Sequence, residues 1–457
     1  MRCICLIALV ASAPLAAQEP LKRIVVGSGA SQEKPQLIWD AVLAAKPELA
    51  VLLGNSVFLD SDNPAVLKAK YAQFGSEPGF TKLRSTCPVV ATWDDHDYGA
   101  IQGGAEFPSK EASQKLFLEF FQEPKFSPRW KRPGVYDARV FGPPEKRVQV
   151  ILLDGRTFRS PLKKSGPAIA PNTDAGATLL GDAQWKWLAE ELRKPAELRL
   201  IGSAIPVIAD EPAGEKWANF PAERERLYKL LRDTKAAGVV LLSGNRLTAE
   251  LSVTDAGLGY PLYELTASGL NMGNQFWHPP EKAAHRIAAL AQGDNFGVIA
   301  IDWARKSPRV ELQIRDVEGD IIAKQKIDIA TLKPGTISPS AAQPVVAGPK
   351  TAGAISPIDA AAKVGQSVTV ELLVAASGKA RDNSRVFLNS AARDSKENFT
   401  VVLDMKKVSE KLAAAGIKDP AAHYKGKTIL VTGVVSTFRD APQIVVEDVG
   451  QIHVVEK

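Results

Sequence analysis

The sequence predicts an α/β protein of layered sheets followed by a smaller, β-rich domain. From Lys22 to about residue 330, short apolar runs typical of buried strands alternate with segments of helical spacing. After a stretch rich in Pro, Gly, Ala and Ser, the rest of the chain carries strand-like runs and one helical segment. The length of 457 residues is also too great for one compact domain, so two or three are expected.

Composition places the chain among globular proteins. Its 45% hydrophobic and 24% charged residues exclude wholesale disorder, coiled coils and collagen-like repeats. The formal charge of +6 is small for this length and gives no reason to expect a nucleic-acid or membrane-surface partner. Two of the three cysteines, Cys3 and Cys5, lie in the first five residues, which excludes a disulfide framework and a Cys-rich zinc site.

Residues 1–17 have the pattern of a secretory signal peptide. Arg2 provides a positive start, Cys3–Val10 is an apolar run too short to span a bilayer, and small residues follow up to Ala17. The alternative is a buried N-terminal helix. No later apolar run is long enough to cross a membrane, so we expect an exported protein, periplasmic or extracellular, without a transmembrane segment.

The first large domain is predicted to span residues 18–330. Its expected helices are Pro35–Ala45 and Asp182–Leu192, which have amphipathic spacing. Its expected strands are Arg23–Val26, Glu48–Leu53, Cys87–Thr92, Val148–Leu153, Arg199–Ser203, Gly238–Leu242, Pro261–Leu265, Gly297–Ile301 and Val310–Ile314. The first six of these strands run into Gly, Ser, Asp or Asn turns. In layered α/β proteins ligands bind outside the carboxyl ends of strands, so these turns are where we expect chemistry.

Residues 331–354 are predicted to form a linker rich in Pro, Ala and Gly, and residues 355–457 a second domain. The second domain contains the helical segment Lys406–Ala415 between β-like runs. The β-like runs are Ser367–Val374, Arg385–Leu388, Phe399–Leu403, Thr428–Val435, Gln443–Val446 and Gln451–Val455. Three strands, a helix and further strands are the order expected of a small OB-type β-barrel.

The segment Trp93–Gly99 is the most unusual of the strand ends. It places Asp94, Asp95, His96 and Asp97 next to one another. Three carboxylates and an imidazole at one strand end repel one another, so they must be solvated or gather a cation. The alternative is a polar turn in which Asp94 or Asp97 caps a helix.

From Arg23 to roughly Asp320 the chain resembles the PhoD-like phosphatases, the alkaline phosphatase D family of the calcineurin-like metallophosphoesterases. The motifs that carry the resemblance occur in family order: Gly27-Ser28, Leu53-Gly54, Trp93–Gly99, Leu153–Arg156, Gly181–Trp185, Glu215–Trp217, Ser243-Gly244 and Asn295–Gly297. The resemblance implies a metallophosphoesterase αββα sandwich. It also implies a pair of metal ions, calcium and iron, that support hydrolysis of phosphomonoesters or phosphodiesters.

Five positions that the resemblance assigns to metal ligands have lost their donors. Gly29 stands in place of a cysteine, Asn55 and Asn245 in place of aspartates, Phe58 in place of a tyrosine and Leu247 in place of a histidine. Four of the five family residues are anionic, and two clustered metal ions need about that much negative charge to leave water. A paired-metal site is therefore not expected to form.

The Trp93–Gly99 motif keeps its polar residues. The resemblance places Asp95 as a metal ligand and His96 near the leaving group, so these two are the residual catalytic candidates. Asp94, Asp95 and Asp97 could hold one loosely bound, oxygen-loving cation such as calcium. The cofactor expectation is thus no metal, or a single weakly bound divalent cation.

Arg156 and Arg246 are the candidates for binding a phosphate-containing ligand, because guanidinium groups can grip phosphate bidentately. Ordinary ion pairing with Asp154 or with the acidic cluster is the alternative.

Three hypotheses for function remain open. The first is a pseudophosphatase that keeps the fold without the metal chemistry, and the second is an active phosphatase or phosphodiesterase with a reduced metal site. The third is an extracytoplasmic binding or scaffold protein. It would act through the C-terminal domain, which resembles OB-fold modules that bind oligosaccharides, nucleic acids or proteins. That resemblance is carried by Val364–Gln366, Val386–Asn389, Tyr424–Lys427, Val431–Gly433 and Pro442–Ile444.

Overall fold

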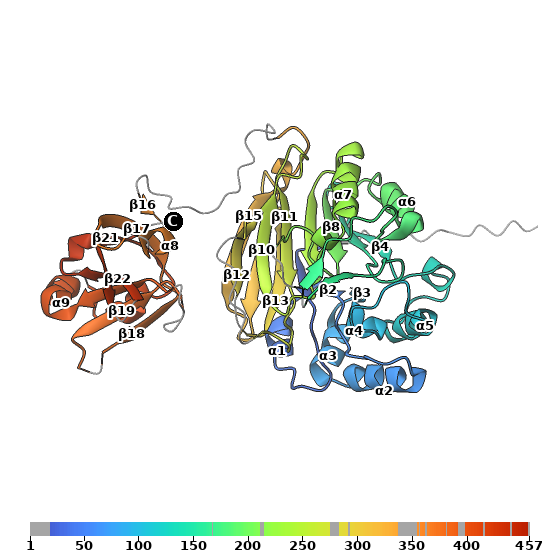
Figure 1. Ribbon diagram of the computed structural model, residues 1–457, viewed down its shortest axis with the longest axis horizontal. Coiled ribbons are helices and arrows are strands. Elements are labelled where there is room, and N and C mark those ends of the chain that lie inside the picture. The colour runs from blue at the N-terminus through green and yellow to red at the C-terminus, as the bar shows by residue number, and fades with distance from the viewer. Residues whose placement is uncertain are drawn as a thin grey trace, which may run out of the picture. The chain divides into compact units, whose positions relative to one another are not determined.

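A computed structural model of the chain forms two compact units, Met1–Val345 and Val346–Lys457, each of which is described by itself (Figure 1). The structure describes residues 19–166, 168–210, 214–274, 283–290, 293–336, 354–355, 357–361, 363–380, 382–391, 398–414, 416–438 and 441–455. The predicted signal peptide and most of the predicted linker lie outside the described residues.

The first unit contains a six-stranded sheet with the order β15-β14-β13-β1-β2-β3, here called sheet A. Its strands are β1 (Arg23–Gly27), β2 (Leu49–Leu53), β3 (Val89–Thr92), β13 (Asn295–Asp302), β14 (Arg309–Asp316) and β15 (Ile321–Asp328). Strands β1, β2 and β3 run parallel, and β13 joins β1 in the antiparallel direction. The carboxyl ends of β1, β2 and β3 therefore lie at one edge of sheet A.

A seven-stranded sheet, sheet B, has the order β12-β10-β11-β9-β8-β5-β4. Its strands are β4 (Asp137–Phe141), β5 (Val148–Leu152), β8 (Leu198–Ser203), β9 (Val239–Ser243), β10 (Ala249–Thr254), β11 (Leu262–Ala267) and β12 (Arg286–Leu290). Strands β5, β8, β9 and β11 are parallel, so their carboxyl ends also share one edge.

The alternation of side chains along sheet A defines the layers. Ile24 and Val26 belong to the core shared with sheet B, whereas Val25 faces a second core formed with helices. Helices α1 (Ile38–Ala44), α2 (Pro64–Gly75), α3 (Pro78–Thr86) and α5 (Lys110–Phe120) contribute to that second core. Helices α6 (Gly181–Glu191) and α7 (Pro221–Asp233) pack with sheet B. The predicted layered α/β fold, with two sheets and flanking helices, is confirmed.

The chain just after β15 is held in the core of the first unit. The Leu332 side chain is fully buried, and its carbonyl oxygen accepts a hydrogen bond of 2.6 Å from the backbone N–H of Gly238, just before β9. The turn Ile329–Thr331, which comes directly before Leu332, is therefore part of the folded layers.

A buried carboxylate fixes the segment after β8. Glu264 on β11 accepts hydrogen bonds of 2.8 Å from the backbone N–H groups of Val207 and Ile208. Burial raises the pKa of Glu264 to about 7, although these two hydrogen bonds oppose the rise.

The second unit is a single sheet with the order β16-β17-β21-β22-β20-β19-β18, and β23 also pairs with β21. Its strands are β16 (Ala354–Ile355), β17 (Ser367–Leu373), β18 (Ala376–Lys379), β19 (Arg385–Asn389), β20 (Thr400–Asp404), β21 (Thr428–Phe438), β22 (Ala441–Val446) and β23 (Ile452–Val454). Its helices are α8 (Pro357–Ala361), α9 (Met405–Ala414) and α10 (Pro420–Tyr424). Within the described residues no pairing joins β18 to β16 or β17, so the OB-type barrel stays a prediction.

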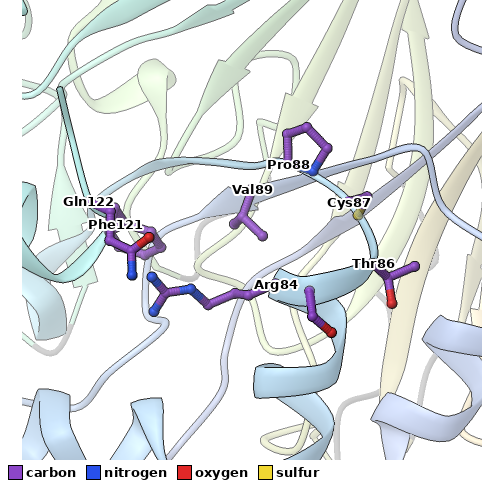
Figure 2. A pocket seen from close by; sticks show the side chains of 8 residues that line it. Arg84, Thr86, Cys87, Pro88, Val89, Phe121 and Gln122 are labelled. Carbon is purple, nitrogen blue, oxygen red and sulfur yellow. The ribbon is translucent and has the colours of Figure 1, made fainter.

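One cavity of the first unit, of about 350 Å³, lies near the amino end of β3 (Figure 2). Its lining includes Arg84, Cys87 and Phe121. Burial raises the pKa of the Cys87 thiol to about 11, so this cysteine is not a reactive group. The cavity lies at the opposite end of β3 from the predicted site. None of the helices in the described part of the chain has the length and apolar character needed to cross a bilayer.

Candidate functional site

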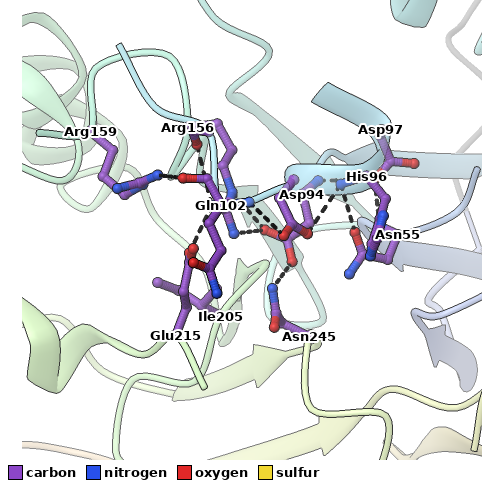
Figure 3. Close-up of polar contacts among 12 residues, drawn as sticks. Asn55, Asp94, His96, Asp97, Gln102, Arg156, Arg159, Ile205, Glu215 and Asn245 are labelled. Atoms are coloured by element: carbon purple, nitrogen blue, oxygen red, sulfur yellow. Dashed lines mark hydrogen bonds and ion pairs between the residues drawn. The ribbon is translucent and has the colours of Figure 1, made fainter. Parts of the chain in front are cut away.

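The predicted site residues come from turns at the carboxyl ends of parallel strands. Gly29 follows β1, Asn55 follows β2, Asp94 follows β3, Arg156 follows β5 and Asn245 follows β9. Figure 3 shows that the side chains of Asn55, Asp94, Arg156 and Asn245 lie in one polar region. We expected the functional side chains at the turns after the strands, and these four side chains from such turns lie close together.

Asp94 forms a buried ion pair with Arg156. Arg156 donates from Nε to Asp94 Oδ1 at 2.8 Å and from Nη2 to the same oxygen, while its Nη1 lies 2.7 Å from Oε2 of Glu215. The three side chains are at most 3% exposed. Burial lowers the pKa of Arg156, but Asp94 and Glu215 outweigh burial and keep the guanidinium charged. Burial raises the pKa of Asp94, and Arg156 opposes that rise.

The second carboxylate oxygen of Asp94 is bonded to Asn245. The side-chain Nδ2 of Asn245 donates to Asp94 Oδ2. Asn245 has a left-handed backbone with φ of 63°, which points its side chain from the turn after β9 towards the turn after β3. Asn245 therefore acts as a hydrogen-bond donor in this region.

Asp97 holds the turn after β2. Its Oδ1 accepts from the backbone N–H groups of Ser56 and Val57 at 2.9 and 3.0 Å. Its Oδ2 accepts from the backbone N–H groups of Asn55 and Asp94. Burial raises the pKa of Asp97 to about 6, and these four hydrogen bonds counteract part of the rise. Asp97 and Asp94 also form a capping box around the short helix α4 (Asp95–Tyr98).

Asp95 is bonded to backbone groups on either side of its turn. Its Oδ1 accepts from the N–H of His96 at 3.1 Å, and its Oδ2 accepts from the N–H of Gln102 at 3.0 Å. Burial favours the neutral acid, but Arg156, His96 and the two backbone donors together hold the pKa of Asp95 below its ordinary value. Asp95 is therefore ionised at neutral pH.

His96 is the more accessible member of the motif, with its side chain 21% exposed. Its Nδ1 lies 2.7 Å from Oδ1 of Asp60, and its ring stacks on Phe58 with the ring centres 4.0 Å apart. Burial lowers the pKa of His96, but Asp60 and Asp95 outweigh this effect and raise it overall. Sequence reasoning missed Asp60, which adopts a left-handed backbone with φ of 44°.

The two predicted phosphate-binding arginines lie in different settings. The Arg156 guanidinium is bound between two carboxylates. Arg246, by contrast, has a buried Nη1 with no hydrogen-bond partner among the described residues. Arg159, fully buried beside them, donates to the carbonyl oxygens of Ser160 and Gln102.

Across the described residues, no group of three or more His, Cys, Asp or Glu side chains is arranged to hold a metal ion. Two of the predicted ligand positions contribute apolar contacts instead. A Cβ added at Gly29 would lie 2.9 Å from the carbonyl oxygen of Ser268 and 3.4 Å from Cδ2 of Leu247, and the Phe58 ring covers His96. The Phe58, Asn55 and Asn245 side chains contact residues of the Trp93–Gly99 motif.

Two facing sheets with a polar region at the carboxyl ends of their strands define a layered α/β protein of the kind expected for a metallophosphoesterase. Residues 127–304 match the family model described as PhoD-like phosphatase.

Comparison with solved structures agrees with this fold. The structure of PhoD is similar with a TM-score of 0.56 and 16% identity, covering 70% of this chain and 73% of that chain. A dimetal phosphatase from Danio rerio aligns with a TM-score of 0.42 and 14% identity, covering 68% of this chain and 100% of that chain. No curated protein matches the chain. At this level of identity, the likeness to PhoD shows a shared fold.

Proposed function

We propose that this protein is an exported PhoD-like phosphoesterase homologue whose two-metal chemistry has been lost, a pseudophosphatase. The observation that carries the proposal concerns the three carboxylates Asp94, Asp95 and Asp97. Each of their six oxygens accepts a hydrogen bond from a protein donor. Carboxylates that hold hard cations direct their oxygens to a shared centre, whereas these are directed to arginine, amide and backbone N–H groups.

The side chains at the five altered positions are not suited to bind a pair of metal ions. Asn245 presents N–H hydrogens to Asp94, and the Asn55 Oδ1 accepts from the backbone N–H of His96 at 3.3 Å. Leu247 and Phe58 have no donor atom in their side chains, and Gly29 has no side chain. The Arg156 guanidinium supplies Asp94 with a positive charge from the protein itself, which it shares with Glu215.

The backbone supports an origin from a ligand-bearing site. Asn55, Asn245 and Leu247 all have left-handed backbones, with φ of 49°, 63° and 54°. For a leucine this conformation costs about 1 kcal/mol or more, and such strain gathers at functional sites. The Leu247 side chain has no polar group, so it forms no hydrogen bond that would offset this cost. The turn is therefore explained if it was shaped for a metal ligand that has since been replaced.

An active phosphoesterase with a reduced metal site is the second candidate. It is favoured by the ionised Asp95 and by the partly exposed His96, whose imidazole is oriented by Asp60. A protonated imidazole held in this way could donate a proton to a leaving group. The Nη1 of Arg246, which has no hydrogen-bond partner in the described part of the chain, could contact a phosphoryl oxygen.

Elemental analysis of the purified full-length protein, beside assays on aryl phosphate mono- and diesters, separates the two candidates. The assays include added calcium, iron or cobalt. We expect far less than one equivalent of bound metal and no turnover above the uncatalysed rate. Stoichiometric metal, together with turnover that Asp95→Ala abolishes, would establish the active enzyme instead.

Restoring the family donors tests where the site lies. The variant combining Gly29→Cys, Asn55→Asp, Phe58→Tyr, Asn245→Asp and Leu247→His should gain metal binding that the parent protein lacks, though not necessarily catalysis. Its matched control carries the same five changes plus Asp95→Ala and should lose the gained metal. If neither protein binds calcium, iron or cobalt, the placement of the site at the strand ends is wrong.

Export rests on the signal-peptide pattern of residues 1–17. Expression in a bacterial host followed by N-terminal sequencing tests it. The protein recovered from the periplasm should begin at Gln18. Recovery of the protein from the cytoplasm with Met1 or Arg2 at its start would contradict export.

A further inference from the structure

A pocket of about 490 Å³ lies between helix α5 and the segment 130–133. Volumes of this size hold small organic ligands in other proteins. None of the residues predicted for the strand-end site lines the pocket. Leu118 and Trp130 supply apolar surface, and Lys110, Lys115, Lys131 and Arg132 supply positive charge.

The charges around this pocket are unbalanced. Four cationic side chains line it against one acid, Glu111. Lys110 donates from Nζ to the carbonyl oxygen of Ala105, so its ammonium is held in place. Lys115 and Lys131 are exposed and form no salt bridge within the described residues. Their charges are therefore available to an anion.

Arg132 lines the pocket and stacks on an aromatic ring. Its guanidinium carbon lies 3.7 Å from the centre of the Tyr136 ring, and its Nη2 donates to the Tyr136 carbonyl oxygen. Its Nε is buried and has no hydrogen-bond partner in the described part of the chain. Burial lowers the pKa of Arg132, because the charged group has lost solvent.

The wall of the pocket is preorganised by Gln114. Its Nε2 donates to the carbonyl oxygens of Arg129 and Arg132 at 2.8 and 2.7 Å, and its Oε1 accepts from the N–H of Gly134 at 2.9 Å. These three bonds tie the loop to helix α5. A wall fixed before binding lowers the entropic cost of holding a ligand.

We propose that this pocket is a binding site for a small organic anion with a flat apolar body, such as an aryl phosphate or aryl phosphonate. The lysines and Arg132 would contact the anionic group, and the Leu118 and Trp130 side chains would contact the body. The pocket shares no lining residue with those predicted for the strand-end site, although its lining includes Thr157, which directly follows Arg156 in the chain. Binding in the pocket would not depend on a metal ion at the strand ends.

Calorimetric titration of the full-length protein with phenylphosphonate tests this proposal, because the phosphonate is not hydrolysed. Inorganic phosphate and phenol supply the anionic group and the apolar body separately. We expect one molecule of phenylphosphonate to bind, with an affinity that falls as salt is added. Phosphate and phenol should each bind more weakly than phenylphosphonate.

The double variant Lys115→Gln/Lys131→Gln should weaken binding about tenfold, the effect expected from losing two partly screened charge contacts. The matched control Lys68→Gln/Lys82→Gln removes two exposed lysines from helices α2 and α3 and should bind like the parent protein. Unfolding midpoints of both variants confirm that each is folded.

Three results would overturn the proposal. The first is unchanged affinity in Lys115→Gln/Lys131→Gln, and the second is equal weakening in the Lys68→Gln/Lys82→Gln control. The third is inorganic phosphate binding as tightly as phenylphosphonate, which would leave an adventitious anion only. Loss of binding in Asp95→Ala, with no loss in the lysine variant, would assign the ligand to the strand-end site and bear on the proposed function instead.

Discussion

The side-chain amide of Asn245 donates a hydrogen bond to Oδ2 of Asp94, which joins two turns 151 residues apart in the sequence. Asn245→Asp would replace this donor by a carboxylate facing another carboxylate. We expect the free energy of unfolding to fall by about 1–3 kcal/mol at neutral pH, because a buried acceptor loses its partner. Urea unfolding followed by circular dichroism measures the change.

Asn55→Asp is the matched control, because it adds one negative charge to the same cluster while keeping the acceptor for the His96 N–H. It should cost clearly less stability than Asn245→Asp. Equal losses in the two variants would mean that added charge, and not the lost hydrogen bond, is responsible.

Arg156→Gln would leave Asp94 and Glu215 without their cation in the interior. Removing one partner of a buried ion pair costs about 3–5 kcal/mol. Arg147→Gln removes an arginine from the Arg147–Glu197 pair, whose side chains are each 25% exposed, and should cost at most about 1 kcal/mol. Thermal unfolding of both variants provides the comparison, and similar losses would argue against a structural role for Arg156.

Strands whose side chains are apolar on both faces were among those that could be predicted. Strand β5, Val148–Leu152, is buried along its whole length and appears in the sequence as a run interrupted only by Gln149. Strand β10 was not predicted, because Glu250 and Ser252 interrupt its apolar pattern. Both are buried and bonded to each other, and Glu250 also pairs with Arg286. A polar network inside the fold thus hides a strand from an argument based on hydrophobicity.

The same limit applies to the candidate site. The turns after β1, β2, β3, β5 and β9 could be named in advance, because the carboxyl ends of parallel strands share an edge. The partners Asp60 and Gln102 could not be named, and Glu215 was named only within a family motif and not as a partner of Arg156. They reach Arg156, His96 and Asp95 from loops whose course depends on tertiary packing.

Glu264 should make stability depend on pH. Its raised pKa means that the folded state binds this proton more tightly than the unfolded state, whose pKa is near the ordinary value of 4.5. The contribution of Glu264 to stability is therefore present below about pH 4.5 and is lost as the pH rises through about 7. A shift of this size corresponds to about 3 kcal/mol.

Glu264→Gln removes the titration while keeping one acceptor for the Val207 or Ile208 N–H. We expect the stability of the parent protein relative to this variant to fall by about 3 kcal/mol between about pH 4.5 and about pH 8. Urea unfolding of both proteins across this range measures the difference. A constant difference would show that Glu264 does not titrate there.

The thiol of Cys87 should react very slowly in the folded protein. With a pKa of about 11, about one thiol in a thousand is ionised at pH 8, and the side chain is only 6% exposed. A Cys3→Ser/Cys5→Ser protein isolates this thiol, and a disulfide reagent such as dithiobisnitrobenzoate reports its reaction. Reaction should become rapid in denaturant, whereas rapid labelling without denaturant would contradict the burial of Cys87.

The burial of Leu332 and its bond to Gly238 bear on how this protein can be divided for study. A fragment that stops at the last residue of β15, Asp328, would uncover core side chains and leave the N–H before β9 unpaired. Such a truncated product would be prone to aggregate, and its inactivity would say nothing about catalysis. A shortened version intended for biochemical work should therefore retain the chain beyond Leu332.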